Sequence, residues 1–106
     1  MTPLELADRI SSVLDSKKGI DIRVIKTDDK SIISDYIVIA TGTSSTHVKA
    51  LADEIEFKLK EIGVTVKHIE GHRSNTWILL DYGSVIVHVF SNEARKFYDL
   101  DGLLEN

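Results

Sequence analysis

Residues 77–90 read WILLDYGSVIVHVF, which is two strongly apolar stretches separated by the dipeptide Tyr82-Gly83. Aliphatic and aromatic residues on both sides of a Gly-containing turn predict a β-hairpin with Tyr82 and Gly83 as a two-residue loop. The register that follows from this loop predicts three opposed pairs, namely Asp81–Ser84, Leu79–Ile86 and Trp77–His88.

The two faces of this hairpin differ in chemistry, because side chains alternate across a strand. One face is purely aliphatic, which suits burial under helices, and it contains Ile78, Leu80, Val85, Val87 and Val89. The other face mixes apolar, indole and imidazole groups, and it contains Trp77, Leu79, Ile86, His88 and Phe90. Since Trp is enriched at binding hot spots, this second face predicts an interface. The alternative is that Trp77 and His88 lie under the terminal helix or tail.

The rest of the chain supplies elements for a sheet flanked by helices. Thr2-Pro3-Leu4-Glu5 predicts a helix start, with Thr as cap, Pro in the first turn and Glu three residues after the cap. A strand follows at 20–26, with Ile20, Ile22 and Val24 on one side. The other predicted elements are a turn at 27–30, a strand at 31–41, a helix that ends at Gly63, a strand at 64–69, a loop at 70–75 and a short helix that ends at Tyr98.

The predicted order αββαβββα indicates an α/β fold, with one domain over residues 1–106 and a mixed five-stranded sheet flanked by helices. The centre of the second strand, YIVIA at 36–40, is apolar on both faces and predicts an interior strand. The strand–helix–strand unit at 32–69 requires a crossover, which we expect to be parallel and right-handed.

Composition and charge exclude several classes of function. The chain has no Cys, which removes disulfides, thiol catalysis and thiolate metal sites. Its net charge of −4 argues against direct nucleic-acid binding and favours a basic protein partner. The apolar run at 36–40 is too short to span a membrane. The first ten residues, MTPLELADRI, carry acids and no apolar signal core, so we expect a cytoplasmic protein.

The sequence contains only weak indications of catalysis. Gly42-Thr43-Ser44, between a strand and a helix, is either a helix cap or a phosphate-binding turn, and it lacks the full spacing of a phosphate-binding loop. His68 and His72 are four residues apart, but a Gly lies between them, so we expect no metal site. We therefore expect that the protein binds no cofactor and is not an enzyme. Phe57 lies opposite the apolar stripe of its helix and is either a lone exposed aromatic or a contact surface.

Four segments together resemble a known family: DYIVIATGTSSTHVKALADEI at 35–55, EG at 70–71, WILLDYGSVIVHVF at 77–90 and EARKFYDLD at 93–101. They are similar to the Iojap or ribosomal silencing factor family. The resemblance implies a non-enzymatic translational repressor that binds the large ribosomal subunit through large-subunit ribosomal protein fourteen. Such a protein blocks joining with the small subunit and lowers translation under nutrient limitation. The implied fold is nucleotidyltransferase-like without catalytic carboxylates, and members of the family are often homodimers.

The resemblance implies that Trp77, a signature position, is the apolar anchor of the docking surface. From the hairpin pattern we expect further partner-binding residues on the same face and at its edge, namely Leu79, Asp81, His88, Arg95, Lys96 and Tyr98. Asp81 is expected to meet a cation of the partner. The chain departs from the family at Leu104, where the family tail commonly has Trp. The alternative function is a nucleotide-binding or nucleotidyltransferase-like enzyme that uses Gly42-Thr43-Ser44.

Overall fold

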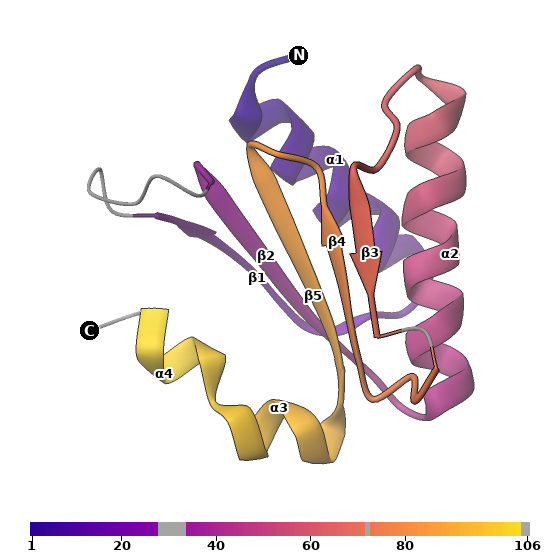
Figure 1. Ribbon diagram of the computed structural model, residues 1–106, viewed down its shortest axis with the longest axis vertical. Helices are drawn as coiled ribbons and strands as arrows, with labels where there is room; N and C mark the ends of the chain where they lie inside the picture. The colour runs from indigo at the N-terminus through magenta and orange to yellow at the C-terminus, as the bar shows by residue number, and fades with distance from the viewer. Residues whose placement is uncertain (28–33, 72, 105–106) are drawn as a thin grey trace.

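The computed structural model describes residues 1–27, 34–71 and 73–104 (Figure 1). The elements follow in the order α1 (Pro3–Ser16), β1 (Ile20–Lys26), β2 (Tyr36–Gly42), α2 (Ser45–Glu61), β3 (His68–Glu70), β4 (Trp77–Asp81), β5 (Val85–Ser91), α3 (Asn92–Tyr98) and α4 (Leu100–Leu104). The five-stranded sheet has the strand order β1-β2-β5-β4-β3. The expected α/β fold with a mixed five-stranded sheet flanked by helices is confirmed.

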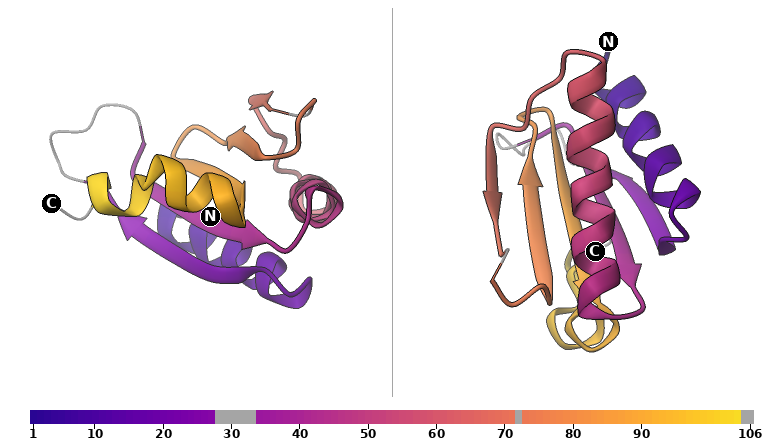
Figure 2. Two further views of the ribbon diagram at one scale, coloured as in Figure 1. Left: turned by 90° about the horizontal axis from the view of Figure 1, so that it is seen from below. Right: turned by 90° about the vertical axis from the view of Figure 1, so that its right-hand side faces the viewer.

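The helices lie on both faces of the sheet (Figures 1 and 2). α1 and α2 pack on one face and enclose the main core, which includes Ile10, Leu14, Leu51, Ile55 and Leu59. α3 and α4 lie on the opposite face (Figure 2, left), and α3 is near one end of the strands (Figure 1). β2 lies between β1 and β5, as its apolar centre predicts.

Local capping signals explain where the first two helices begin. The Thr2 hydroxyl accepts from the Glu5 amide at 3.1 Å, and the Thr2 amide donates to the Glu5 carboxylate at 2.9 Å. This reciprocal pair is a capping box and confirms the predicted start of α1. At α2 the Ser44 hydroxyl accepts from the amide of His47.

The hairpin of β4 and β5 is confirmed, but its predicted register is wrong by two residues. The observed pairs include Asp81–Ile86, Leu79–His88 and Trp77–Phe90. The Tyr82 amide donates to the Val85 carbonyl at 2.9 Å, so the turn is formed by Gly83 and Ser84 instead of Tyr82 and Gly83. Gly83 takes the required positive φ of 86°, and Tyr82 is buried in the core. A shift by two residues keeps every side chain on its predicted face.

The prediction that Ile20, Ile22 and Val24 share one side of β1 is wrong for Ile20. The register between Ile20 and Arg23 is interrupted, and Asp21 in this segment has a φ of 48°. Such a bulge adds one residue to the strand and reverses the alternation beyond it. Ile20 consequently pairs with Thr41 and lies on the face opposite Ile22.

Two other strands are shorter than predicted. β3 covers residues 68–70 and so overlaps the strand expected at 64–69 only at residues 68 and 69, because the Val64 amide instead donates to the Leu59 carbonyl and closes the end of α2. Glu70, which was expected in the following loop, belongs to β3. In the strand expected at 31–41, pairing begins at Tyr36. Residues 28–33, which contain most of the predicted turn and the start of that strand, lie outside the described residues.

The crossover from β2 through α2 to β3 is parallel, as predicted, because β5 runs parallel to β2 and β4 runs antiparallel to both β5 and β3. The two strands are not neighbours, and the tail differs from the prediction. The parallel neighbour of β2 is β5, and β3 lies at the far edge of the sheet, two strands further on. The chain after Tyr98 forms the short helix α4, an element absent from the predicted order. It follows a left-handed residue, Asp99, with a φ of 46°.

Candidate functional site

The face of the sheet away from α1 and α2, here called the open face, carries the aromatic and imidazole groups of the hairpin. The strand register arranges its side chains in three rows across the sheet. The row beneath α3 contains Thr41, Phe90 and Trp77, and the middle row contains Arg23, Ile39, His88, Leu79 and Glu70. The outer row contains Ile25, Ile37, Ile86, Asp81 and His68. His88 therefore lies in the middle of the open face.

An aromatic cluster forms where α3 meets the sheet. The ring of Trp77 lies 4.5 Å from that of Tyr98 and 4.9 Å from that of Phe90, measured between centroids. Phe90 is fully buried, whereas Trp77 is partly buried. Tyr98 comes from α3, so the alternative in which the terminal helix covers Trp77 holds in part.

Trp77 and His88 are joined by a hydrogen bond of 2.9 Å, in which the indole Nε1–H donates to His88 Nδ1. Because an indole nitrogen can only donate, Nδ1 of His88 must be unprotonated. Burial lowers the pKa of His88 to about 4. Near neutral pH the imidazole is therefore uncharged and carries its proton on Nε2.

An apolar groove of about 640 Å³ occupies the part of the open face that α3 leaves uncovered. Side chains of the outer and middle rows form its floor, namely Ile25, Ile37, Ile86, His88 and Leu79. Leu103 and Leu104 of α4 contribute to its lining on one side. Asp81, Glu70 and His68 line it at the edge formed by β3 and β4.

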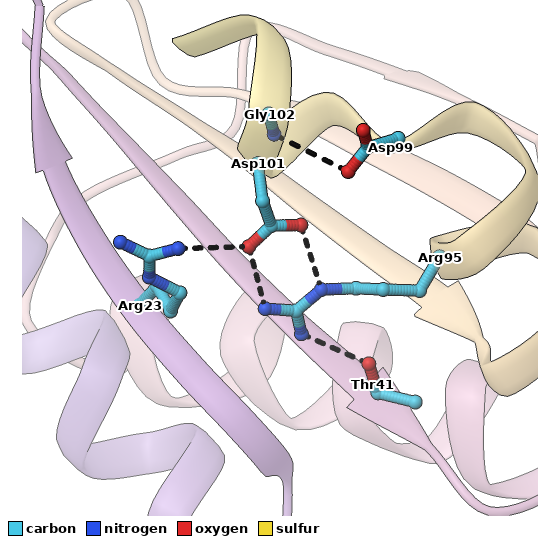
Figure 3. A network of polar contacts seen from close by, with 6 residues as sticks. All are labelled: Arg23, Thr41, Arg95, Asp99, Asp101 and Gly102. Carbon is cyan, nitrogen blue, oxygen red and sulfur yellow. Dashed lines mark hydrogen bonds and ion pairs between the residues drawn. The ribbon is translucent and has the colours of Figure 1, made fainter. Parts of the chain in front are cut away.

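A polar network, here called the clasp, fastens α4 to the sheet (Figure 3). Arg95 donates two hydrogen bonds to the Asp101 carboxylate, from Nε at 3.0 Å and from Nη2 at 2.9 Å. Its third nitrogen donates to the Thr41 hydroxyl at 2.9 Å, and Arg23 lies 3.4 Å from the same carboxylate. The hydrogen bonds from Arg95 hold the pKa of Asp101 below its usual range.

The predicted site residues separate into groups in the structure. Trp77, His88 and Tyr98 meet in the aromatic cluster, and Leu79 and Asp81 line the groove beside it. Arg95 points into the clasp, and only 12% of its side chain is exposed. Lys96 is exposed on α3.

Sequence reasoning did not identify two strongly exposed apolar side chains on this side of the molecule. Phe97 is 81% exposed on α3, and Leu103 is 72% exposed on α4. A seven-residue helix is too short for its periodicity to show which face is buried, and α4 was not predicted. Phe57, for which two interpretations were open, is 58% exposed on α2.

The Gly42-Thr43-Ser44 turn has its polar groups engaged within the fold. The Thr43 amide donates to Nδ1 of His47 at 2.9 Å, and Ser44 caps α2. A Cβ on Gly42 would lie 2.8 Å from Val48, so glycine is needed for the close approach of β2 to α2. These contacts favour the helix-cap interpretation.

Among residues 1–27, 34–71 and 73–104, no three His, Cys, Asp or Glu side chains lie close enough together to hold a metal ion. His72, the second member of the His68 pair, lies outside this part of the chain. Within the same residues no helix has the length and apolarity needed to cross a membrane.

Comparisons with known proteins agree on one family. The family model described as "Ribosomal silencing factor during starvation" matches residues 1–106. The "Ribosomal silencing factor RsfS" of Chromobacterium violaceum is 38% identical over 99 residues, which are 93% of this chain and 81% of that protein. A crystal structure of a Chromobacterium violaceum protein superposes with a TM-score of 0.95 at 37% identity, covering 100% of this chain and 88% of the other. The mouse "Mitochondrial assembly of ribosomal large subunit protein 1" is 32% identical over 100 residues, which are 91% of this chain and 43% of that protein.

Proposed function

Because the chain belongs to the ribosomal silencing factor family, we propose that it is a non-enzymatic, cytoplasmic repressor of translation. In this proposal it binds the large ribosomal subunit through large-subunit ribosomal protein fourteen and blocks joining with the small subunit. Translation would thereby fall under nutrient limitation. The name of the mouse relative, which refers to the large ribosomal subunit, supports the choice of subunit.

The single observation that carries this proposal is the partly uncovered open face. It combines an aromatic cluster with a groove, and Phe97, Tyr98 and Leu103 project beside them with between 48% and 81% of their surface exposed. Apolar and aromatic groups that cluster on an exposed surface mark protein interaction sites. We place the contact with the ribosome here, with Trp77 as the anchor.

Charge supports a basic protein as the partner. The chain has a net charge of −4, and Glu70 and Asp81 lie at one edge of the open face. Arg23 and Arg95 on the same face both form ion pairs with Asp101, which offsets part of their positive charge. An acidic surface accelerates and orients the approach of a basic ribosomal protein.

The mechanism is steric and needs no chemical step. A domain docked on the face of the large subunit that meets the small subunit occupies space that the small subunit needs. Repression then depends on the affinity of docking relative to that of subunit joining. Homodimer formation through the same surface would compete with docking.

Sucrose-gradient sedimentation of purified subunits, at a Mg²⁺ concentration that allows joining, tests the proposal. We expect the protein to sediment with the large subunit and the peak of joined ribosomes to fall. Trp77→Ala and Phe97→Ala should each weaken binding by about tenfold or more. Phe57→Ala is the matched control, because it removes an exposed aromatic ring from α2, on the other side of the sheet.

Two results would contradict the proposal. If the wild-type protein stays at the top of the gradient and joining is unchanged, the function assigned here is wrong. If the protein binds but Trp77→Ala and Phe97→Ala, shown by circular dichroism to be folded, bind as well as Phe57→Ala, the surface is wrong. A rise in melting temperature with nucleotide and Mg²⁺ would instead favour the enzymatic alternative.

A further inference from the structure

His88 presents a hydrogen-bond donor to the groove. Its Nδ1 is occupied by the indole N–H of Trp77, so the ring proton is on Nε2. Trp77 does not line the groove, whereas His88 does, so the Nε2 side of the ring is the side that faces it. Trp77 thus determines which nitrogen of His88 donates.

This donor has no acceptor within the part of the chain that the structure describes. His88 is only 8% exposed, and its neighbours in the middle row are the aliphatic side chains of Ile39 and Leu79. The adjacent outer row contributes the side chains of Ile37 and Ile86 to the groove floor. The buried polar atoms without a partner in this part of the chain are Asn75 Oδ1 and Tyr82 OH, so Nε2 of His88 is still reached by solvent. A bound group that accepts a hydrogen bond from Nε2–H in this apolar site would replace that solvent contact.

The carboxylates at the edge of the groove are differently engaged. Glu70 accepts from His68 at 3.0 Å. Asp81 Oδ1 accepts from the Gly83 amide at 2.7 Å, and among the described residues the Asp81 carboxylate meets no cation. The groove therefore offers an apolar floor, a central N–H donor and an acidic end.

We propose that the groove binds an extended segment of a basic protein, with a main-chain carbonyl of that segment accepting from His88 Nε2–H. An aliphatic side chain of the segment fills the space over Ile37 and Ile86, and a Lys or Arg beside it meets Asp81. The proposal rests on the function proposed above, since the segment belongs to the partner on the large ribosomal subunit. His88 then determines specificity, and Trp77 determines the tautomer of His88.

Two substitutions of similar size separate the roles of the two ring nitrogens. In His88→Asn the amide group lies near the position of Nδ1, so it retains an acceptor for Trp77 and loses the donor in the groove. In His88→Gln the longer side chain places an amide N–H near the position of Nε2, so it retains the donor and loses the acceptor for Trp77. Binding of each variant to purified large subunits is measured by pelleting through a sucrose cushion, with Phe57→Ala as control.

We expect His88→Asn to bind about tenfold more weakly than the wild type, the loss of one hydrogen bond in an apolar site, and His88→Gln to bind more tightly than His88→Asn. Asp81→Asn should also weaken binding and reduce its dependence on salt. Because Trp77 is the only tryptophan of the chain, its fluorescence emission shows separately that only the Gln variant disturbs the indole.

The outcomes distinguish this inference from the function on which it rests. If the wild-type protein does not pellet with large subunits, both are overturned. If the wild type binds and the Asn variant equals or exceeds the Gln variant, the proposed function stands and the groove contact is wrong. If the two variants change only the self-association of the protein, seen by sedimentation velocity, the occupant is a second copy and the proposal is wrong.

Discussion

Replacing Arg95 by Met tests whether the clasp holds α4 on the sheet. Arg95 donates two hydrogen bonds to Asp101 and one to Thr41, and the two charged side chains are only 12% and 19% exposed. Removing one partner of a largely buried charged pair costs about 3–5 kcal/mol. Arg23 remains 3.4 Å from the carboxylate and offsets part of this cost. We therefore expect a loss of about 2–3 kcal/mol in the free energy of unfolding.

Urea and thermal unfolding, followed by circular dichroism, measure this loss. For a chain of this length, about 2–3 kcal/mol corresponds to a decrease of roughly 8–15 °C in melting temperature. Arg95→Lys keeps the charge but not the planar two-pronged contact, so it should recover only part of the stability. Lys49→Met is the matched control, because its ion pair with Asp53 is as short, 2.9 Å, but both side chains are half exposed. We expect it to cost less than about 0.5 kcal/mol.

The difference in the free energy of unfolding between the wild type and Arg95→Met should depend on pH, which provides a second measurement. The pKa of Asp101 is lowered in the folded protein, so the clasp contributes its full stability above the pKa of the unfolded carboxyl, near 3.8. That contribution is lost as the pH falls through the lower pKa of the folded state. The gap between wild type and Arg95→Met should therefore narrow below about pH 4. If Arg95→Met unfolds like Lys49→Met at pH 7, the structural role given to Arg95 is wrong, and its predicted role as a partner contact regains support.

Two further predictions concern the groove and its surroundings. A Cβ on Gly71, where φ is 92°, would lie 1.9 Å from the Trp77 carbonyl oxygen, so Gly71→Ala should cost more than about 2 kcal/mol in urea unfolding. Gly63→Ala, with a φ of 82° and no atom within 4 Å of the added Cβ, should cost about 1 kcal/mol, and equal losses would contradict the steric argument. Burial lowers the pKa of His88 from 6.5 to about 4, so its unfolded form binds a proton first and its contribution to stability falls as the pH drops from 6.5 toward 4. Fluorescence of Trp77 should change with a midpoint near pH 4, and a midpoint near pH 6.5 would refute the burial argument.

Much of the fold was predictable because its signals are local. The capping box at Thr2 and Glu5 depends on residues three positions apart, and it correctly predicted the start of α1. The alternation along residues 77–90 correctly predicted which side chains share a face of the hairpin, although the pairing was wrong by two residues. The predicted position of the turn was wrong because Tyr82 is buried in the core and belongs to the strand side of the turn. The dipeptide Tyr82-Gly83 alone does not indicate this burial.

The candidate site was less predictable than the fold. The pattern of the hairpin placed Trp77 and His88 on one face, where the structure joins them by a hydrogen bond. The roles of Arg95 and Phe97 did not follow from the pattern. Arg95 was predicted to contact a partner at the edge of the open face, but its side chain lies in the clasp. Phe97 was not predicted to be a site residue, yet it is the most exposed of the large apolar side chains that the structure describes.

The amino-acid sequence by itself determined most of the elements, the chemistry of the two faces of the hairpin and the family, because these depend on short-range periodicity and on ordered motifs. The tertiary structure alone decided what the open face presents. Arg95 reaches Thr41 across 54 positions of the chain, and Arg23 reaches Asp101 across 78. Such contacts arise only when strands distant in sequence pair and bring a terminal helix over them. The same pairing places His88 at the centre of the sheet and leaves the groove beside it uncovered.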